Sequence, residues 1–117
     1  MKFSWQQIGN PLITEILCNV GLDGVVLDTE HGCYSPETLL SCIQVANICN
    51  KKCYVRLPEP EKVTIRSCLD GGADGLIFSM IENTSQAELI QQHTKYPIQG
   101  GQRGLGLVRQ NLWGLSE

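Results

Sequence analysis

Two kinds of apolar pattern alternate along the chain. Short apolar runs predict buried strands, and apolar residues three or four positions apart predict helices. The predicted strands are residues 2–8, 25–27, 53–56 and 75–80. The predicted helices begin at Pro11, at Pro36 and after Pro60, with a fourth over about residues 85–93. Strand and helix recur at intervals of about 20 to 30 residues, which is typical of a parallel α/β sheet.

Residues suited to helix ends support these boundaries. Asn10 and Ser35 each precede a proline and can accept free backbone N–H groups. Gly21 can end the first helix in a left-handed conformation, and Gly71 and Gly72 end the third. The predicted buried stripes are Leu12, Ile13, Ile16, Leu17 and Val20 in the first helix, and Leu39, Leu40, Ile43 and Ala46 with Cys42 in the second.

An internal repeat agrees with this pattern. Residues 21–27 (GLDGVVL) match residues 72–78 (GADGLIF). In both copies a glycine ends a helix, Asp-Gly turns the chain, and an apolar strand follows. The repeat indicates two successive units of the same α/β architecture.

Composition narrows the function classes. The 117 residues suffice for one domain at most. A net charge of −3 without a basic cluster disfavours nucleic-acid binding. No apolar run approaches the roughly 20 residues that span a bilayer, and the first residues do not resemble a signal peptide. We expect a cytoplasmic protein that binds neither nucleic acid nor membrane.

Six cysteines raise the question of a disulfide or zinc site. They contain no C-x-x-C pair, and several occupy apolar helix or strand positions. Cysteine is a common small core residue, and thiols of cytosolic proteins stay reduced. The spacing therefore favours core positions over metal or disulfide roles.

The strongest candidate chemistry follows the second predicted strand. Residues 25–27 run directly into Asp28, Thr29, Glu30 and His31. Strand ends of this kind carry active sites in α/β folds, and an Asp close to a His can make it a general base. The alternative is a polar strand end that caps the next helix and faces water.

The third predicted strand ends on Arg56. A guanidinium can bind a carboxylate or an oxyanion with parallel hydrogen bonds. Alternatively, Arg56 pairs with Glu59 or Glu61 on the surface. His93, on a helix with polar neighbours, is expected to be a solvated surface residue.

Residues 99–117 differ from the rest of the chain. Gly100, Gly101, Gly104 and Gly106 surround Arg103. Such a segment can approach a ligand closely with its backbone, but it lacks the strand-turn-helix context of a phosphate loop. A mobile connection is the other interpretation.

Several of these motifs together resemble the N-terminal part of the HpcH/HpaI aldolases, class II enzymes that act on 2-oxo acids through a divalent metal. The matching segments are Trp5–Pro11, Leu27–Gly32, Val55–Leu57, Cys68–Ala73 and Arg103–Gly106. The resemblance implies that residues 1–117 form one partial domain, the N-terminal half of a (β/α)8 barrel, ending in the Gly-rich loop and tail 99–117. A complete barrel typically needs about 250 residues, and this chain holds about four βα units.

The resemblance also implies roles for individual residues. His31 matches the catalytic base, and Arg56 matches the residue that binds the pyruvate moiety and stabilises the enolate-like transition state. Asp70 matches the Asp that increases the basicity of the His from a neighbouring subunit. Asp28 matches a residue that orients the His, although it could instead only cap backbone N–H groups. Glu30 is expected to make structural hydrogen bonds near the site.

The implied reaction is cleavage or formation of a 4-hydroxy-2-oxo acid, giving pyruvate, or an analogue, and an aldehyde. The implied cofactor is Mg2+ or Mn2+, whose Glu and Asp ligands in the family lie beyond Glu117, so we expect no metal ligands in this chain. A homo-oligomer is expected for the full-length protein. Two alternatives remain: a non-catalytic fragment or association module, and an acyl-CoA lyase of the citrate lyase β-subunit type.

Overall fold

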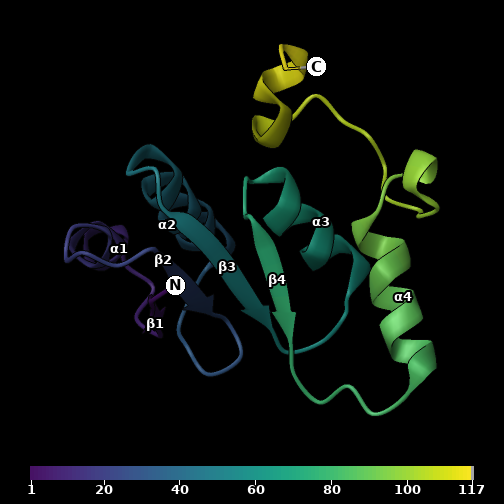
Figure 1. Cartoon of the computed structure of the whole chain (residues 1–117), viewed down its shortest axis with the longest axis horizontal. Helices are drawn as coiled ribbons and strands as arrows, with labels where there is room; N and C mark the ends of the chain where they lie inside the picture. The colour runs from purple at the N-terminus through teal and green to yellow at the C-terminus, as the bar shows by residue number, and fades with distance from the viewer. Residues whose placement is uncertain (117) are drawn as a thin grey trace.

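Four parallel strands form one sheet in the order β1-β2-β3-β4 (Figure 1). The computed structural model describes residues 1–116. The strands are β1 (Phe3–Gln6), β2 (Gly24–Asp28), β3 (Lys52–Leu57) and β4 (Gly75–Phe78). Each is followed by a helix: α1 (Pro11–Cys18), α2 (Pro36–Ile48), α3 (Lys62–Asp70) and α4 (Thr84–Thr94). Within residues 1–116 the short 3-10 helices η1 (Pro97–Gln99) and η2 (Arg109–Gly114) follow α4. The predicted α/β fold with a parallel sheet is confirmed.

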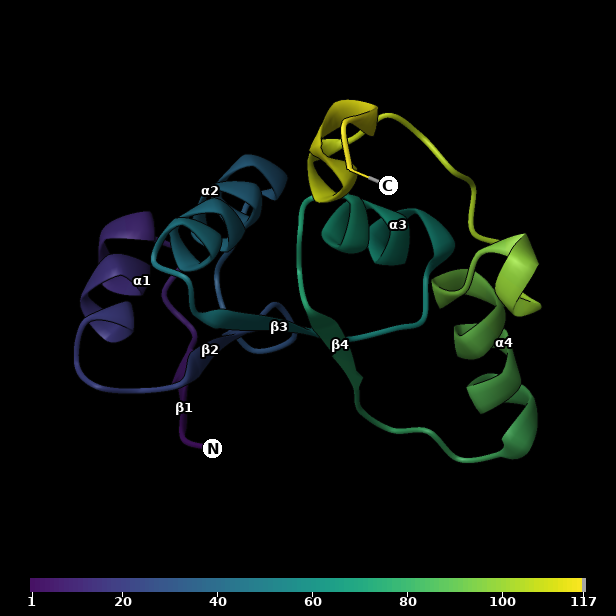
Figure 2. The ribbon, with the colours of Figure 1, turned by 45° about the horizontal axis from the view of Figure 1, so that its top comes forward.

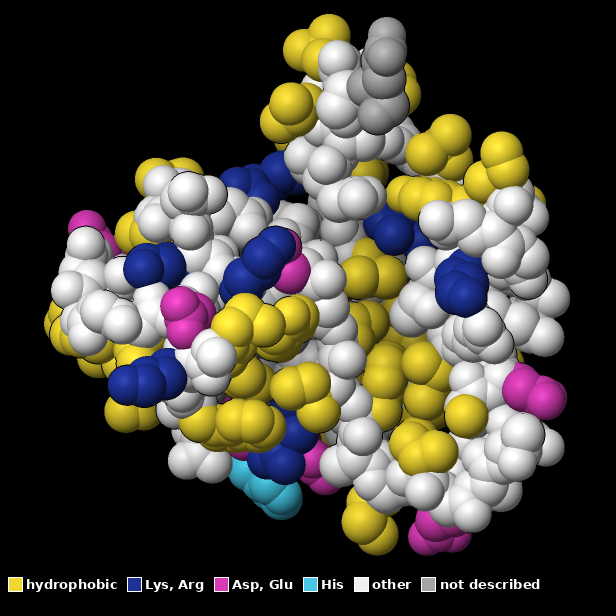
Figure 3. Space-filling model, viewed as in Figure 1, with side chains coloured by type: hydrophobic (Ala, Val, Ile, Leu, Met, Phe, Trp, Pro, Cys, Tyr) yellow, Lys and Arg dark blue, Asp and Glu magenta, His cyan; other side chains and the backbone are white. Residues whose placement is uncertain are grey.

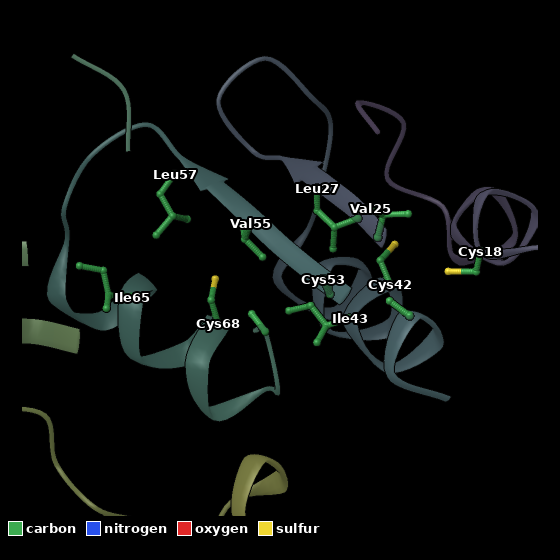
Figure 4. Close-up of a cluster of buried hydrophobic side chains, with 12 residues drawn as sticks. Cys18, Val25, Leu27, Cys42, Ile43, Cys53, Val55, Leu57, Ile65 and Cys68 are labelled. Carbon is green, nitrogen blue, oxygen red and sulfur yellow. The ribbon is translucent and has the colours of Figure 1, made fainter. Parts of the chain in front are cut away.

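The helices cover only one face of the sheet. Figure 2 shows α1, α2 and α3 on the same side of the strands, while α4 packs beside α3. None of the helices within residues 1–116 is long and apolar enough to cross a membrane. The hydrophobic core lies between these helices and the strands, as Figure 4 shows. Its largest fully buried apolar side chains are Val25, Leu27, Ile43, Val55, Leu57 and Ile65.

The opposite face of the sheet has no helix over it within the described residues. Parallel register places Trp5, Val26, Tyr54 and Gly75 in one row across the four strands. Trp5 is 49% exposed, and apolar side chains are visible over the strands on this face (Figure 3). In a closed barrel this face would be the filled interior.

The prediction for the apolar stripe of α1 is wrong for three of its residues. Leu12, Ile16 and Val20 are each more than half exposed. The buried side chains of α1 are instead Thr14 and Cys18. The physical reason is a polar contact: the Thr14 hydroxyl donates to Gln6 Oε1 of β1 at 2.9 Å, which turns that side of the helix toward the sheet. In α2, Cys42, Ile43 and Ala46 are buried as predicted, whereas Leu40 is exposed.

The predicted helix ends and the repeat have direct structural counterparts. Asn10 and Ser35 cap α1 and α2, and Gly21 and Gly72 both have positive φ angles. Asp23 and Asp74 occupy the same position in the two copies. Asp23 Oδ2 accepts the backbone N–H of Lys2 at 2.5 Å, and Asp74 Oδ2 accepts that of Cys53 at 2.9 Å. Each aspartate therefore ties its turn to the start of the preceding strand.

Four of the six cysteines are buried core residues, as the sequence predicts. Burial raises the pKa of the Cys18 thiol to about 11 and that of the Cys68 thiol to about 12. Cys33 is exposed in the loop that follows β2, and Cys49 is partly buried.

Candidate active site

Asp28 and Arg56 lie side by side where β2 and β3 end. The parallel register pairs them directly across the two strands. Arg56 Nε donates to Asp28 Oδ1 at 2.9 Å, and Arg56 Nη2 donates to Asp28 Oδ2 at 2.6 Å. This two-point contact fixes both planar groups, because each needs the other in one orientation.

Asp28 collects further donors from three segments of the chain. Trp5 Nε1 donates to Oδ2 at 2.9 Å, and Gln7 Nε2 donates to the same oxygen at 3.4 Å. The backbone N–H groups of Glu30 and His31 donate to Oδ1, each at 3.1 Å. The side chain is fully buried, and the Arg56 guanidinium holds the pKa of the carboxyl well below its usual range. Asp28 is therefore an ionised carboxylate at neutral pH.

Arg56 lies between two carboxylates and an indole ring. Its Nε is 3.4 Å from Glu30 Oε2, and its guanidinium carbon lies 5.0 Å from the centre of the Trp5 ring. Its ion pairs are thus with Asp28 and Glu30 rather than with Glu59 or Glu61 on the surface. Glu61 instead caps α3 by accepting the first backbone N–H groups of that helix.

His31 is exposed in the loop after β2, at the same edge of the sheet. Asp28 contacts its backbone N–H rather than its imidazole. The loop is further held by Thr29 Oγ1, which donates to the Arg56 carbonyl at 2.6 Å. Gly32 makes this geometry possible, because a Cβ there would lie 2.1 Å from the Asp28 carbonyl oxygen. Asp28 therefore positions His31 through the main chain.

Glu30 connects the site to the end of β4. Ser79 Oγ donates to Glu30 Oε2 at 2.8 Å. The sequence motifs do not single out Ser79 or Trp5 as site residues. Ser79 directly follows β4 but lies inside the predicted strand 75–80, so the predicted strand end did not mark it. Trp5 shares its strand row with Val26, close to Asp28, and only the pairing of β1 with β2 reveals this.

Asp70 is not part of this cluster. It ends α3, at the edge of the sheet where β4 begins, and Asp70 Oδ1 accepts from Arg103 Nη2 at 2.9 Å. His93 is half-buried, in contrast to the expected solvated residue. The chain after α4 folds back on this part of the helix, since the Gln102 backbone N–H donates to the Gln92 carbonyl at 2.7 Å.

The cluster does not fit a divalent metal by itself. Both Asp28 oxygens accept from Arg56, and Glu30 accepts from Ser79. Within residues 1–116, no three His, Cys, Asp or Glu side chains are grouped so that they could hold a metal ion. What the arrangement can do is bind an anion beside an exposed imidazole, because a guanidinium and a histidine lie at one edge of the sheet.

Comparisons with known proteins agree on one family. The family model described as HpcH/HpaI aldolase/citrate lyase matches residues 3–111. A 4-hydroxy-2-oxovalerate aldolase from Novosphingobium aromaticivorans is 36% identical over 116 residues, covering 94% of this chain and 42% of its own length. A 5-keto-4-deoxy-D-glucarate aldolase from Escherichia coli K12 is 32% identical over 111 residues, covering 94% of this chain and 43% of its own.

Solved structures also resemble this chain. A HpcH/HpaI aldolase/citrate lyase family protein from Burkholderia cenocepacia has a TM-score of 0.88 at 27% identity, over 97% of this chain and 46% of its own. A citrate synthase has a TM-score of 0.83 at 32% identity, over 88% of this chain and 42% of its own. The chain therefore spans less than half the length of the relatives it matches.

Proposed function

The chain belongs to the HpcH/HpaI aldolase/citrate lyase family, and we propose that it supplies the base and the anion-binding arginine of a 4-hydroxy-2-oxo-acid aldolase. The reaction cleaves the carbon-carbon bond between C3 and C4, giving pyruvate or an analogue and an aldehyde. The observation that carries the proposal is the placement of the Asp28–Arg56 pair beside His31 at the carboxyl edge of the sheet. Two relatives described above are named as a 4-hydroxy-2-oxovalerate aldolase and a 5-keto-4-deoxy-D-glucarate aldolase, which supports a reaction on an oxo acid.

His31 is the proposed base. In cleavage it takes the proton from the C4 hydroxyl as the C3–C4 bond breaks, and the resulting enolate is protonated at C3 by the His31 imidazolium or by water to give pyruvate. Condensation runs the same proton transfers in reverse. An exposed imidazole whose backbone is fixed by a buried carboxylate suits this role, because the ring remains accessible while its loop cannot drift. In this arrangement Asp28 is a positioning residue.

Arg56 is the proposed binding residue for the substrate carboxylate. Its Nε and Nη2 are occupied by Asp28, but no group within residues 1–116 accepts from Nη1. That nitrogen is available to the carboxylate and C2 oxygen of a 2-oxo acid. Asp28 and Trp5 hold the guanidinium in one orientation, so little of its freedom is lost on binding.

Asp70 can influence a His31 only from another subunit. Within one chain the two residues lie at opposite edges of the sheet, separated by the length of a strand, about 17 Å. We therefore propose that the full-length protein is a homo-oligomer in which Asp70 approaches the site of a neighbour. A divalent metal, Mg2+ or Mn2+, would polarise the substrate carbonyl there, held by residues outside this chain.

The proposal is tested by pyruvate release from a 4-hydroxy-2-oxo acid with Mg2+ or Mn2+ present. The measurement uses the chain alone and a protein that joins it to the remaining βα units. His31→Ala is expected to abolish release in the longer protein, and His93→Ala, at the far end of α4, is the matched control. Full activity of the His31→Ala protein would refute the assignment.

One observation favours a second function for the chain alone. Within the described residues, the face of the sheet opposite the helices has no covering element, and Trp5 on it is half exposed. Such an apolar face suits association with another protein segment. If the chain neither binds pyruvate with Mg2+ nor releases it, yet binds the remaining βα units supplied separately, the association function is supported.

A further inference from the structure

Only two charged side chains within residues 1–116 are buried, Asp28 and Arg103. Burying a charge is expensive unless a partner of opposite sign is present. Asp28 has Arg56, at the carboxyl edge of the sheet. Arg103 has Asp70, near the edge where β4 begins. The first pair belongs to the candidate active site, whereas the second has no role in the proposed function.

Arg103 is held by several contacts. Its Nη2 donates to Asp70 Oδ1 at 2.9 Å and to Gln110 Oε1 at 3.1 Å. Its guanidinium carbon lies 4.5 Å from the centre of the Tyr96 ring. Its backbone N–H donates to the Lys95 carbonyl at 2.9 Å. The Gly-rich segment thus brings one arginine from beyond α4 to the end of α3.

Without Arg103, the end of α3 would be an unfavourable position for the negative charge of Asp70. Asp70 is the last residue of α3, where the exposed carbonyl groups and the negative end of the helix dipole repel negative charge. Arg103 offsets that repulsion and binds only Oδ1. No group within residues 1–116 donates to Asp70 Oδ2, and the side chain keeps 20% of its surface exposed. One oxygen of an oriented carboxylate therefore faces outward.

We propose that Arg103 is a positioning residue that holds Asp70 ready to contact His31 of a neighbouring subunit. The inference rests on the proposed function and adds the residue that pairs with Asp70 and holds its Oδ1, while Oδ2 receives no hydrogen bond within residues 1–116. It also gives the Gly-rich segment a role, because the backbone around Arg103 brings this buried guanidinium to the end of α3.

Few other charged or titratable groups face this pair. Arg109 Nη1 donates to the Gly71 carbonyl at 2.9 Å, and Tyr96 stacks on Arg103. The charged groups near His31 are Asp28, which accepts its backbone N–H, and Arg56 and Glu30 in the adjacent cluster. Those groups are unchanged by substitutions at residues 70 and 103, so a shift in His31 basicity in such variants reports on the proposed contact.

The test is the pH profile of kcat/KM for aldol cleavage in the full-length oligomer. Asp70→Asn is expected to move the acidic limb, which reports deprotonation of the base, to lower pH by about one unit, because a nearby carboxylate raises the pKa of an imidazolium. Arg103→Met is expected to shift the limb in the same direction and to lower kcat/KM about tenfold. Arg103→Lys retains the positive charge, so its acidic limb should lie close to that of the unchanged protein. Arg66→Met removes an exposed arginine of α3 and is the matched control.

The double variant decides whether Arg103 acts through Asp70. Adding Arg103→Met to Asp70→Asn should change the profile no further, although it can lower the melting temperature. Independent, additive shifts would overturn the inference, as would an Arg103→Met profile identical to that of the unchanged protein. If Arg103→Met does not fold, the Arg103→Lys and Asp70→Asn profiles still decide. An unshifted Asp70→Asn profile combined with an inactive His31→Ala protein would refute this inference and the approach of Asp70 to a neighbouring site, and would leave the proposed roles of His31 and Arg56 standing.

Discussion

At the scale of single residues, Asp28 is the group on which the candidate site depends. One buried carboxylate accepts hydrogen bonds from β1, from the loop before α1, from β3 and from its own loop. Loss of one member of this network should destabilise the fold, because a buried polar group left without its hydrogen-bond partner costs free energy. The same contacts orient Arg56 and fix the backbone of His31.

The ionisation of Asp28 predicts how stability responds to acid. Arg56 depresses its folded-state pKa, so the ionised form contributes stability that is complete above the ordinary Asp pKa of about 3.9 and is lost as the pH falls toward the folded value. Asp28→Asn should therefore lower the free energy of unfolding at about pH 6 and weaken its dependence on pH below about 4. Urea unfolding followed from about pH 2.5 to about pH 6, a range that spans the ordinary Asp pKa, measures this. Parallel curves for the two proteins would contradict it.

Gly32 predicts a second effect at this scale. A Cβ at Gly32 would lie 2.1 Å from the Asp28 carbonyl oxygen and 2.6 Å from that of Gln7, so Gly32→Ala must displace the loop that carries His31. We expect kcat for aldol cleavage in the longer protein to fall at least about tenfold. Gly104→Ala is the control, since a Cβ there meets no atom within 4 Å and φ is not positive. Equal activities would show that the loop accommodates the methyl group.

At the scale of elements, the strands and helices could be predicted from the sequence because their local signals agree. Asn10 and Ser35 cap helices as expected, and the Asp-Gly turns precede two apolar strands. The predicted buried stripe of α1 is partly wrong, because periodicity identifies an apolar side of a helix but does not show which side packs on the sheet. The Thr14–Gln6 hydrogen bond decided that question, and it joins residues whose pairing is not visible in a helical pattern.

The two faces of α2 allow a matched test of the core. Ile43 is 1% exposed and Ile48 is 79% exposed, in the same helix. Ile43→Ala should lower the free energy of unfolding by about 3 kcal/mol, because it removes buried surface and leaves a cavity. Ile48→Ala should change it by less than about 1 kcal/mol. Chemical denaturation of both variants gives the comparison, and similar losses would mean that Ile48 is covered in solution.

Part of the site followed from the same local reasoning. His31 follows the end of β2, and Arg56 lies one residue before the end of the neighbouring parallel strand β3, so both lie where these strands end. The direct pairing of Asp28 with Arg56 did not follow, because it depends on the register between strands. Arg103 shows the same limit: its partner Asp70 lies 33 positions away, and no local pattern connects them.

At the scale of the whole molecule, the half-covered sheet is the dominant feature. Three helices protect one face, and the other has no helix over it within the described residues; Trp5 on that face is 49% exposed, whereas Val26 beside it is buried. Relatives more than twice as long have chain enough for further units. Covering this face with further βα units would complete it and bury Trp5.

Tryptophan fluorescence can follow that completion. Trp113→Phe leaves Trp5 as the single tryptophan. Iodide should quench Trp5 readily in the chain alone, and quenching should drop several-fold when the remaining βα units cover the face, because the half-exposed indole becomes buried. Equal quenching in both proteins would show that the added units leave this face open.

The exposed thiol in the loop after β2 has a practical use. Cys33 is exposed, while Cys18, Cys42, Cys53 and Cys68 are buried, so a maleimide dye should attach first at Cys33 in the native protein. That position follows Gly32 directly and lies close to His31 in the chain. A dye attached there needs no substitution, and a change in its emission would report when a molecule binds beside His31, where strands β2 and β3 end.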